Sequence, residues 1–206
     1  MSRHHTIITG TGRAGTTFLV QLLTALHLET GFSSNDESVY ANCDAGMEWD
    51  PRNADAPYFV KDPCLCDYLD EWLEADDVII DHAIIPMRDL FAAAESRRDV
   101  VRRSNSSLPP NEIPGGLWHT TEPEKQEAVL TAQLYKIVEA IAKRDIPVTF
   151  LYFPRLVEDP RYLYEKLRFL LGNIGYAEFL EVFHRIVKPE LVHDFQAETP
   201  CQALAS

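Results

Sequence analysis

The stretch of sequence that constrains the fold most strongly is His5-Thr6-Ile7-Ile8-Thr9-Gly10-Thr11-Gly12-Arg13-Ala14-Gly15-Thr16-Thr17. Its first five residues are rich in β-branched side chains, which predicts a β-strand over residues 5–9. The glycines that follow predict a tight turn. Apolar residues then recur from Phe18 to Leu26 at helical spacing, which predicts an α-helix over residues 16–28. A strand, a glycine turn and a helix in this order are typical of a parallel α/β sheet.

The glycine turn also has the composition of an anion-binding loop. Backbone N–H groups in such a turn can close around a phosphate at the positive end of the following helix. The spacing from Gly10 to Gly15 matches a Walker A loop, but Thr16 stands where nucleotide triphosphatases have lysine. Arg13 can supply the missing positive charge, because a guanidinium forks onto phosphate or sulfate oxygens. The predicted binding residues are Gly12, Arg13, Ala14, Gly15, Thr16 and Thr17. The alternative is a turn that binds nothing.

Strand-like and helix-like segments alternate along the rest of the chain. Further strands are predicted over residues 58–61, 81–87 and 147–153, and helices over 67–75, 89–103, from Thr121 onward, 160–171 and 176–186. Thr121 and Glu124 have the spacing of a capping box. Residues 78–80 fit either a strand or the end of a helix, and residues 33–55 and 104–120 are predicted loops. This order predicts one domain, residues 1–206, with a three-layer α/β/α fold around a mostly parallel sheet.

Composition narrows the possible partners. The formal net charge of −13 argues against nucleic-acid binding, which needs a broad basic surface, but it leaves room for a small anionic ligand. No apolar run reaches the roughly 20 residues of a membrane span, and the polar N-terminus does not resemble a signal peptide, so we expect a cytoplasmic protein without stable membrane insertion. The four cysteines lack the spacing of a zinc site, and no metal is expected. The oligomeric state is left open.

A second candidate anion site combines Arg88 with Ser96. Arg88 follows a predicted strand, and ligands of open α/β sheets bind at the carboxyl ends of the strands. Ser96 lies eight residues further, about two helical turns along the next helix and on nearly the same face. The alternative is an arginine that pairs with an acidic neighbour, beside an unrelated serine.

These motifs resemble the sulfotransferases that use 3'-phosphoadenosine 5'-phosphosulfate (PAPS). The run Arg13-Ala14-Gly15-Thr16-Thr17 is similar to their 5'-phosphosulfate loop, and Arg88 with Ser96 resembles the pair that grips the 3'-phosphate. Phe153 falls where an aromatic residue lines the adenine pocket, although Pro154 and Arg155 stand where that family commonly has acidic residues. The resemblance spans nearly the whole chain and is to the compact bacterial branch, without a C-terminal basic-glycine loop.

The resemblance implies a P-loop nucleotide-kinase-like sulfotransferase fold. It also implies transfer of a sulfuryl group from PAPS to a hydroxyl or amine of a small-molecule acceptor, with adenosine 3',5'-bisphosphate as product. Two other functions remain open from the sequence. One is a P-loop small-molecule kinase or nucleotide triphosphatase, which the missing lysine disfavours. The other is a catalytically degenerate nucleotide-binding domain.

The catalytic candidates follow from the needs of sulfuryl transfer. Arg13 and Lys61 are the predicted cations that stabilise charge in the transition state. A carboxylate from the loop after the first helix is the predicted base for the acceptor proton, either Glu37 or its neighbour Asp36. The other candidate bases are His82, on a predicted strand, and His119, in the loop with Gly115 and Gly116. The alternative for Asp36 and Glu37 is an ordinary polar turn, and the alternative for His82 is a packed, hydrogen-bonded residue. His119 could belong to a lid over the acceptor site.

Overall fold

In a computed structural model, which describes residues 2–35, 37–75, 77–193 and 195, the centre of the molecule is a parallel β-sheet. Its strand order is β4-β1-β5-β6. The strands are β1 (Arg3–Ile8), β4 (Phe59–Lys61), β5 (Val78–Met87) and β6 (Val148–Tyr152). Every pairing in this sheet is parallel, so the carboxyl ends of the four strands lie along the same edge.

Apolar side chains on the inner strands point to both faces of the sheet. Ile8 and Ile84 pack into one cluster of buried residues, whereas Ile7, Ala83 and Ile85 pack into another. All five side chains are at most 1% exposed. This two-sided burial explains the nearly continuous apolar sequence of these strands, which is typical of parallel sheets covered on both faces.

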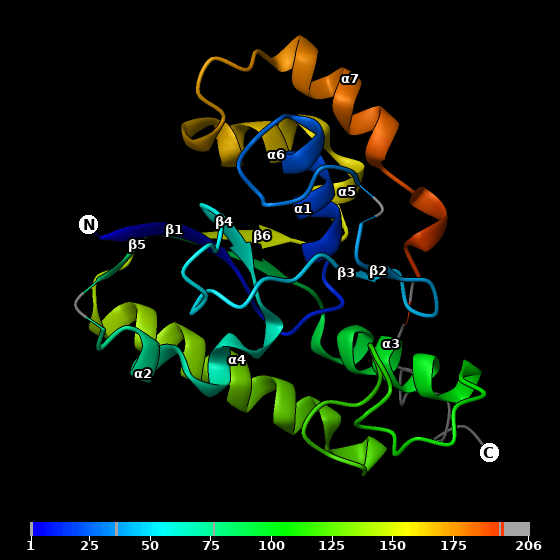
Figure 1. Cartoon of the computed structure of the whole chain (residues 1–206). Coiled ribbons are helices and arrows are strands. Elements are labelled where there is room, and N and C mark those ends of the chain that lie inside the picture. Colours follow the sequence, from blue (N-terminus) through cyan, green and yellow to red (C-terminus); the bar gives the residue numbers. More distant parts are fainter. Residues whose placement is uncertain (1, 36, 76, 194, 196–206) are drawn as a thin grey trace, which may run out of the picture.

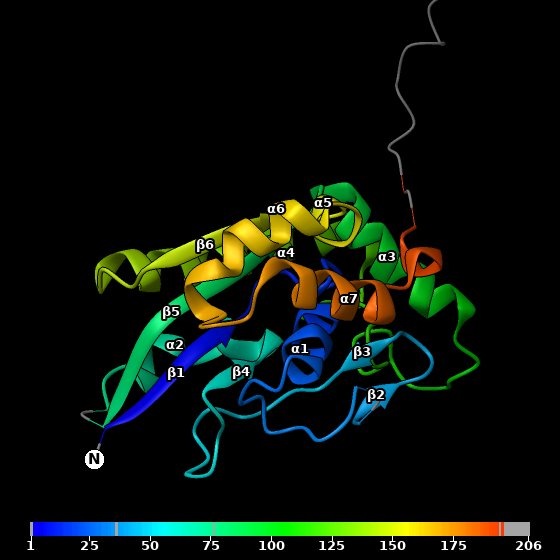
Figure 2. The same ribbon diagram turned by 90° about the horizontal axis from the view of Figure 1, so that it is seen from above.

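Helices cover both faces of the sheet (Figures 1 and 2). On the first face lie α1 (Thr16–Ala25), α6 (Pro160–Leu167) and α7 (Tyr176–Ile186), whose apolar side chains share one cluster. On the second face lie the short helix α2 (Leu69–Trp72) and the long helix α4 (Gln126–Lys143). Helix α3 (Leu90–Arg103) follows β5 and packs against α4 through Ala93, Ala94 and Leu130. The prediction of a three-layer α/β fold around a parallel sheet is confirmed.

Short elements cover the edge of the sheet where the strands end. A two-stranded antiparallel hairpin, β2 (Val39–Tyr40) with β3 (Ala45–Gly46), interrupts the predicted loop over residues 33–55. The helix α5 (Arg155–Glu158) follows β6, and the 3-10 turn η4 (Pro189–Leu191) follows α7. The hairpin and η4 lie near each other beside the start of α1 in both views (Figures 1 and 2).

The structure settles one open assignment and changes several predicted boundaries. Residues 78–80, which fit either a strand or the end of a helix, belong to β5, because they continue its pairing with β1. The long helix begins at Gln126, after the 3-10 turn η2 (Pro123–Lys125), and no side chain caps it. The predicted capping box at Thr121 was therefore wrong; instead the Thr120 hydroxyl accepts a hydrogen bond from the Glu122 N–H.

The predicted helix over residues 67–75 is also broken. The 3-10 turn η1 (Pro63–Asp67) precedes α2, and the Asp62 carboxylate caps this turn by accepting from the Cys64 N–H. Similarly, α6 gives way after Leu167 to the 3-10 turn η3 (Arg168–Leu170). None of the helices in the described part of the chain has the length and apolar character that crossing a bilayer requires.

Candidate functional site

The glycine turn between β1 and α1 has the backbone conformation that its sequence predicts. Gly12, Arg13 and Gly15 have positive φ angles of 65°, 55° and 84°. A Cβ atom on Gly15 would lie 3.0 Å from Leu156 Cδ1 and 3.3 Å from Phe153 Cδ2, so the turn packs closely against the end of β6 and α5. Gly15 is the residue immediately before α1, which places the turn at the positive end of that helix.

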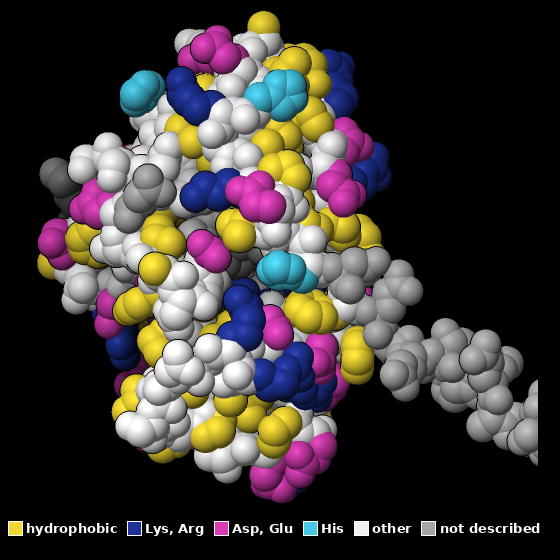
Figure 3. Space-filling view, turned by 90° about the vertical axis from the view of Figure 1, so that its right-hand side faces the viewer, with side chains coloured by type: hydrophobic (Ala, Val, Ile, Leu, Met, Phe, Trp, Pro, Cys, Tyr) yellow, Lys and Arg dark blue, Asp and Glu magenta, His cyan; other side chains and the backbone are white. Residues whose placement is uncertain are grey.

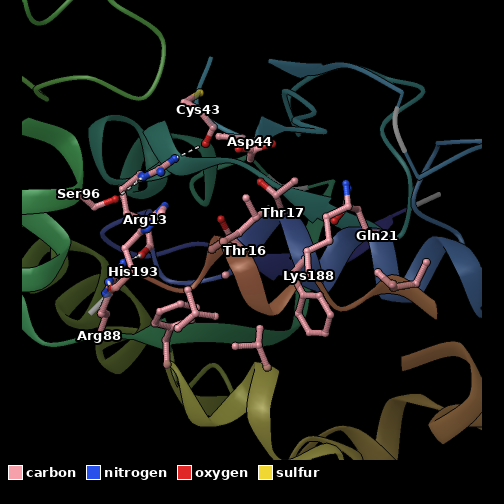
Figure 4. Close-up of a pocket in the computed structure, with 18 of the residues that line it drawn as sticks. Arg13, Thr16, Thr17, Gln21, Cys43, Asp44, Arg88, Ser96, Lys188 and His193 are labelled. Atoms are coloured by element: carbon pink, nitrogen blue, oxygen red, sulfur yellow. Dashed lines mark hydrogen bonds between the residues drawn. The ribbon is translucent and has the colours of Figure 1, made fainter. Parts of the chain in front are cut away.

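Arg13 connects the turn to α3 and to the hairpin. Its Nε donates a hydrogen bond to Ser96 Oγ at 3.1 Å, and its Nη1 donates to the Cys43 carbonyl at 2.7 Å (Figure 4). Neither partner is a carboxylate, and burial lowers the pKa of Arg13. The half-buried guanidinium therefore brings a positive charge to this site that its two hydrogen-bond partners do not neutralise.

Arg88 lies beside the same turn. Its Nη1 donates to the Arg13 carbonyl at 3.1 Å, and its Nη2 donates to the carbonyl of His193. Its guanidinium lies over the ring of Phe153, 4.7 Å from the centroid, and within 5.7 Å of the centroid of Phe195. The structure thus brings together Arg13, Arg88, Ser96 and Phe153, which come from four separate segments of the chain.

These side chains surround a cavity of about 310 Å3, which we call the first cavity. In Figure 4, Arg13, Arg88 and Ser96 lie at one end of it, Thr16 and Thr17 lie in the middle, and Gln21 and Lys188 lie at the other end. Arg88 and Phe153 also border an adjoining hollow that is lined by the aromatic residues Phe91, Tyr152 and Phe195. The first cavity and this hollow together offer cations, hydroxyls and aromatic rings.

Several positive side chains lie on the face of the molecule that carries the β2–β3 hairpin and η4. In Figure 3, separate groups of Lys and Arg side chains lie on this face, some of them directly below the hollow in its middle, with acidic and apolar side chains between them. The whole chain has a formal net charge of −13. A local cationic site in an acidic protein suits a small anionic ligand rather than a long polyanion.

A second cavity, of about 290 Å3, lies on the other side of the turn. Both cavities are lined by Arg13, Thr16, Cys43 and Ala45. The second cavity is also lined by Gly12, Glu48, Lys61, Cys64, Arg97 and part of the loop between α3 and α4. The turn with its arginine therefore forms a wall between two adjacent cavities.

Lys61 lies at the second cavity, at the end of β4. Its side chain is 3% exposed. Its Nζ donates to the Gly46 carbonyl at 2.6 Å and to Glu48 Oε1 at 2.9 Å. Burial lowers the pKa of Lys61, although Glu48 acts in the opposite direction. The Lys61–Glu48 pair thus places one cation and one carboxylate beside the turn.

Glu37 was predicted as a base, but it lies away from both cavities. Its side chain is exposed, and Oε2 accepts hydrogen bonds from the Ser33 N–H and Oγ at 2.9 and 3.0 Å. The hydrogen bond from the Ser33 N–H lowers the pKa of Glu37, which opposes the role of a base at neutral pH. The prediction for Glu37 is therefore not supported, and Asp36 lies outside the described residues.

Neither histidine candidate lines a cavity described above. His82 Nε2 is 2.8 Å from Thr149 Oγ1, and its ring packs on Phe169. His119 Nε2 is 3.1 Å from Asp67 Oδ2 and its ring stacks on Trp118. Both therefore have structural partners of their own.

Two residues of the predicted anion-binding turn, Gly12 and Ala14, do not line the first cavity. Ala14 is 0% exposed and belongs to the core cluster beneath α1, so its side chain holds the turn in place. Gly12 lines the second cavity and not the first. A Cβ on Gly12 would lie 2.6 Å from Arg97 Nη2. Gly15, Thr16 and Thr17 line the first cavity.

Glu48, Arg97 and Lys188 line the cavities but were not predicted from the sequence. Arg97 directly follows Ser96, and this adjacency was the sequence signal that could have pointed to it. Glu48 stands in an irregular loop, and Lys188 follows the last long helix, so neither has a spacing that points to a site. Only the folded hairpin and the return of the chain after α7 bring them to the cavities.

The fold and the site define an α/β protein with two adjacent cavities at the carboxyl ends of its strands, separated by a cationic glycine turn. No protein-family model, curated protein or solved structure matches the chain. Within the described ranges, no three or more His, Cys, Asp or Glu side chains gather in a group suited to a metal ion.

Proposed function

We propose that the protein is a PAPS-dependent sulfotransferase with a small-molecule acceptor. The proposal depends on one observation: the two candidate anion-binding motifs line the same cavity. The turn over residues 12–17 and the pair Arg88 and Ser96 are separated by about 70 residues in the sequence, yet Arg13 bonds directly to Ser96. A ligand with an anionic group at each end, such as an adenosine bisphosphate, matches two such motifs on one cavity wall.

The residues of the first cavity fit the parts of the donor. Backbone N–H groups at the start of α1, with the hydroxyls of Thr16 and Thr17, would hold the 5'-phosphosulfate. Arg88 and Ser96 would hold the 3'-phosphate. Phe153, already stacked on Arg88, and the neighbouring aromatic hollow would take the adenine.

The donor would supply the sulfuryl group, whose bond to the 5'-phosphate oxygen breaks as a bond to the acceptor oxygen or nitrogen forms. Arg13 lies on the wall between the two cavities, where it would stabilise the charge on the sulfuryl oxygens and the leaving phosphate. Glu48 replaces Glu37 as our candidate base. Its carboxylate lines the second cavity, where it would take the acceptor proton, and Lys61 orients it.

The first prediction concerns binding of adenosine 3',5'-bisphosphate. Replacing Arg13 or Arg88 by Ala should weaken this binding by roughly tenfold to a hundredfold, because each removes a charge-assisted contact to phosphate. Isothermal titration calorimetry measures the affinity. Arg161→Ala is the matched control, since Arg161 is an exposed residue that pairs with Glu165 on α6.

Full affinity in both the Arg13 and the Arg88 variants would remove the donor assignment. Circular dichroism and thermal unfolding of the same samples separate a lost contact from a lost fold. A failure of the wild-type protein to bind the bisphosphate at all would end the proposal.

A further inference from the structure

The second cavity has a position that suits a second substrate. A group-transfer reaction needs its two substrates on opposite sides of the group that moves. Arg13 and Thr16 line both cavities, so a molecule in the second cavity would lie across the turn from a molecule in the first. If the proposed function holds, the second cavity is the acceptor site.

The charges around the second cavity do not balance. Three cations line it, Arg13, Lys61 and Arg97, whereas Glu48 is the one carboxylate among the described residues that line it. Glu48 is already paired with Lys61. Arg13 is shared with the first cavity, where the donor would neutralise it. Of the three lining cations, Arg97 is then the one that has no counter-charge among the described residues.

Arg97 is an unusual buried cation. Its side chain is 7% exposed, and it donates from Nη1 to the Gly116 carbonyl at 3.0 Å and from Nη2 to the Thr11 carbonyl at 2.8 Å. Its guanidinium lies 4.6 Å from the ring centroid of Trp118, and its buried Nε has no hydrogen-bond partner. In the described part of the chain, Arg97 forms no ion pair with a carboxylate. Burying an unpaired charge is costly, and an anion in the cavity would reduce this cost.

The remaining walls of the second cavity are largely apolar. Pro63, Ile113, Pro114 and Leu117 line it, and the volume of about 290 Å3 is that of a small-molecule site. These walls suit a compact apolar body, while Arg97 suits one negative charge. Glu48 needs a hydroxyl from which it can take a proton.

We propose that the second cavity binds a small hydroxylated monoanion, which has an apolar body, a hydroxyl that accepts the sulfuryl group, and a separate carboxylate or similar acidic group. This inference rests on the proposed sulfotransferase function. It goes further because it assigns the charge class of the acceptor and gives Arg97 the role of selecting it. Cationic and neutral analogues of the same shape would bind less well.

The test uses two pairs of isosteric probes with the full-length protein. 4-Hydroxybenzoate and 3-hydroxybenzoate carry the charge, and their amides do not. Each is titrated calorimetrically into protein saturated with adenosine 3',5'-bisphosphate, and also into protein without it. We expect each acid to bind at least about tenfold more tightly than its amide, the effect of one charge-assisted contact. Equal or tighter binding of the amides, or no binding of either acid, would overturn the inference.

Variants at Cys64 locate the binding. Cys64 is exposed and lines the second cavity but not the first. Cys64→Trp should fill the cavity and abolish binding of the acids, whereas Cys64→Ser should keep it. Both variants should bind adenosine 3',5'-bisphosphate as the wild type does. Undiminished binding of the acids by Cys64→Trp would place them elsewhere and contradict the inference.

Variants at Arg97 test the source of selectivity. Arg97→Lys keeps the positive charge, and Arg97→Met removes it while keeping an extended side chain. The ratio of acid to amide affinity should stay above one in Arg97→Lys and fall to about one in Arg97→Met. A preserved ratio in a folded Arg97→Met variant would overturn the role of Arg97. If this variant does not fold, the probe pairs and the Cys64 variants still decide whether the cavity binds the acids.

The two proposals fail in different ways. If the wild-type protein does not bind adenosine 3',5'-bisphosphate, the sulfotransferase function is contradicted. Tight bisphosphate binding, together with a missing preference for the acids, contradicts only the assignment of the acceptor.

Discussion

Glu48 and Glu37 lie in the same irregular segment of the sequence, but their surroundings assign them different roles. Glu37 accepts two hydrogen bonds from Ser33 at the surface, and the backbone bond lowers its pKa. Glu48 lines the second cavity and accepts a hydrogen bond from the buried ammonium of Lys61. A base must lie within reach of the proton that it removes, and for this reason Glu48 is the base that we propose.

This difference gives a prediction for single residues. Glu48→Gln should reduce turnover by roughly a hundredfold or more, within the range that a lost general base costs, because the amide cannot accept the acceptor proton. Glu37→Gln, the matched control, should leave turnover within about twofold, since surface substitutions away from a site have small effects. Transfer from sulfur-labelled PAPS to the best acceptor of a screen measures both rates.

Neither substitution should change the affinity for adenosine 3',5'-bisphosphate, because neither residue lines the first cavity. A Glu48→Gln enzyme with full turnover would exclude Glu48 as the base. A large loss of turnover in Glu37→Gln would mean that its loop moves to the site during the reaction.

At the scale of elements, the turn before α1 depends on packing from distant parts of the chain. Gly15 has a φ of 84°, and Leu156 of α5 and Phe153 after β6 leave almost no room for a side chain there. Gly172 also has a positive φ, 56°, but apart from its chain neighbours no atom of the described residues lies within 4 Å of where its Cβ would be. A side chain at Gly15 would meet both backbone strain and crowding, whereas a side chain at Gly172 would meet backbone strain alone. Comparing the two positions therefore separates the two effects.

Gly15→Ala should lower the free energy of unfolding by about 2–3 kcal/mol, since strain and crowding add. Gly172→Ala should cost about 1 kcal/mol, because only the backbone is strained. Urea denaturation measures both values. Gly15→Ala should also weaken bisphosphate binding, whereas Gly172→Ala should not. Equal costs would show that the contacts of Gly15 with Leu156 and Phe153 relax easily.

At the scale of the whole molecule, an acidic protein concentrates cations at one place. Arg13, Arg88 and Lys188 line the first cavity, in a chain whose net charge is −13. Local cations and backbone N–H groups decide which small anions bind, while the net charge disfavours extended polyanions. We therefore expect the site to distinguish between ligands by the placement of their anionic groups.

This placement predicts a choice between nucleotides. Adenosine 3',5'-bisphosphate at about one hundred times its Kd should raise the Tm by roughly 5–10 °C, since it binds only the folded protein. ATP with Mg²⁺ should raise it much less, because Thr16 replaces the lysine that holds the β- and γ-phosphates. Thermal shift at fixed protein concentration compares them. A larger shift with ATP and Mg²⁺ would favour a kinase or nucleotide triphosphatase.

Much of the fold could be predicted because it depends on local patterns. The order of strands and helices follows from apolar periodicity, and the turn after β1 follows from its glycines. The start of α4 could not be predicted in the same way. A 3-10 turn at Pro123 delays it, and the Thr120 hydroxyl bonds in a pattern that competes with the capping box at Thr121.

The sequence by itself determined the parallel α/β architecture. It also determined that Arg13, Thr16, Arg88 and Ser96 lie near the carboxyl ends of the strands. These depend on spacing along the chain, because all carboxyl ends of a parallel sheet meet at one edge. The tertiary structure alone decided that Glu48 rather than Glu37 lies at the cavities, and that Arg97 is buried with no carboxylate partner among the described residues. Both depend on how loops cross the sheet edge, and contacts between distant loops leave no periodic trace in the sequence.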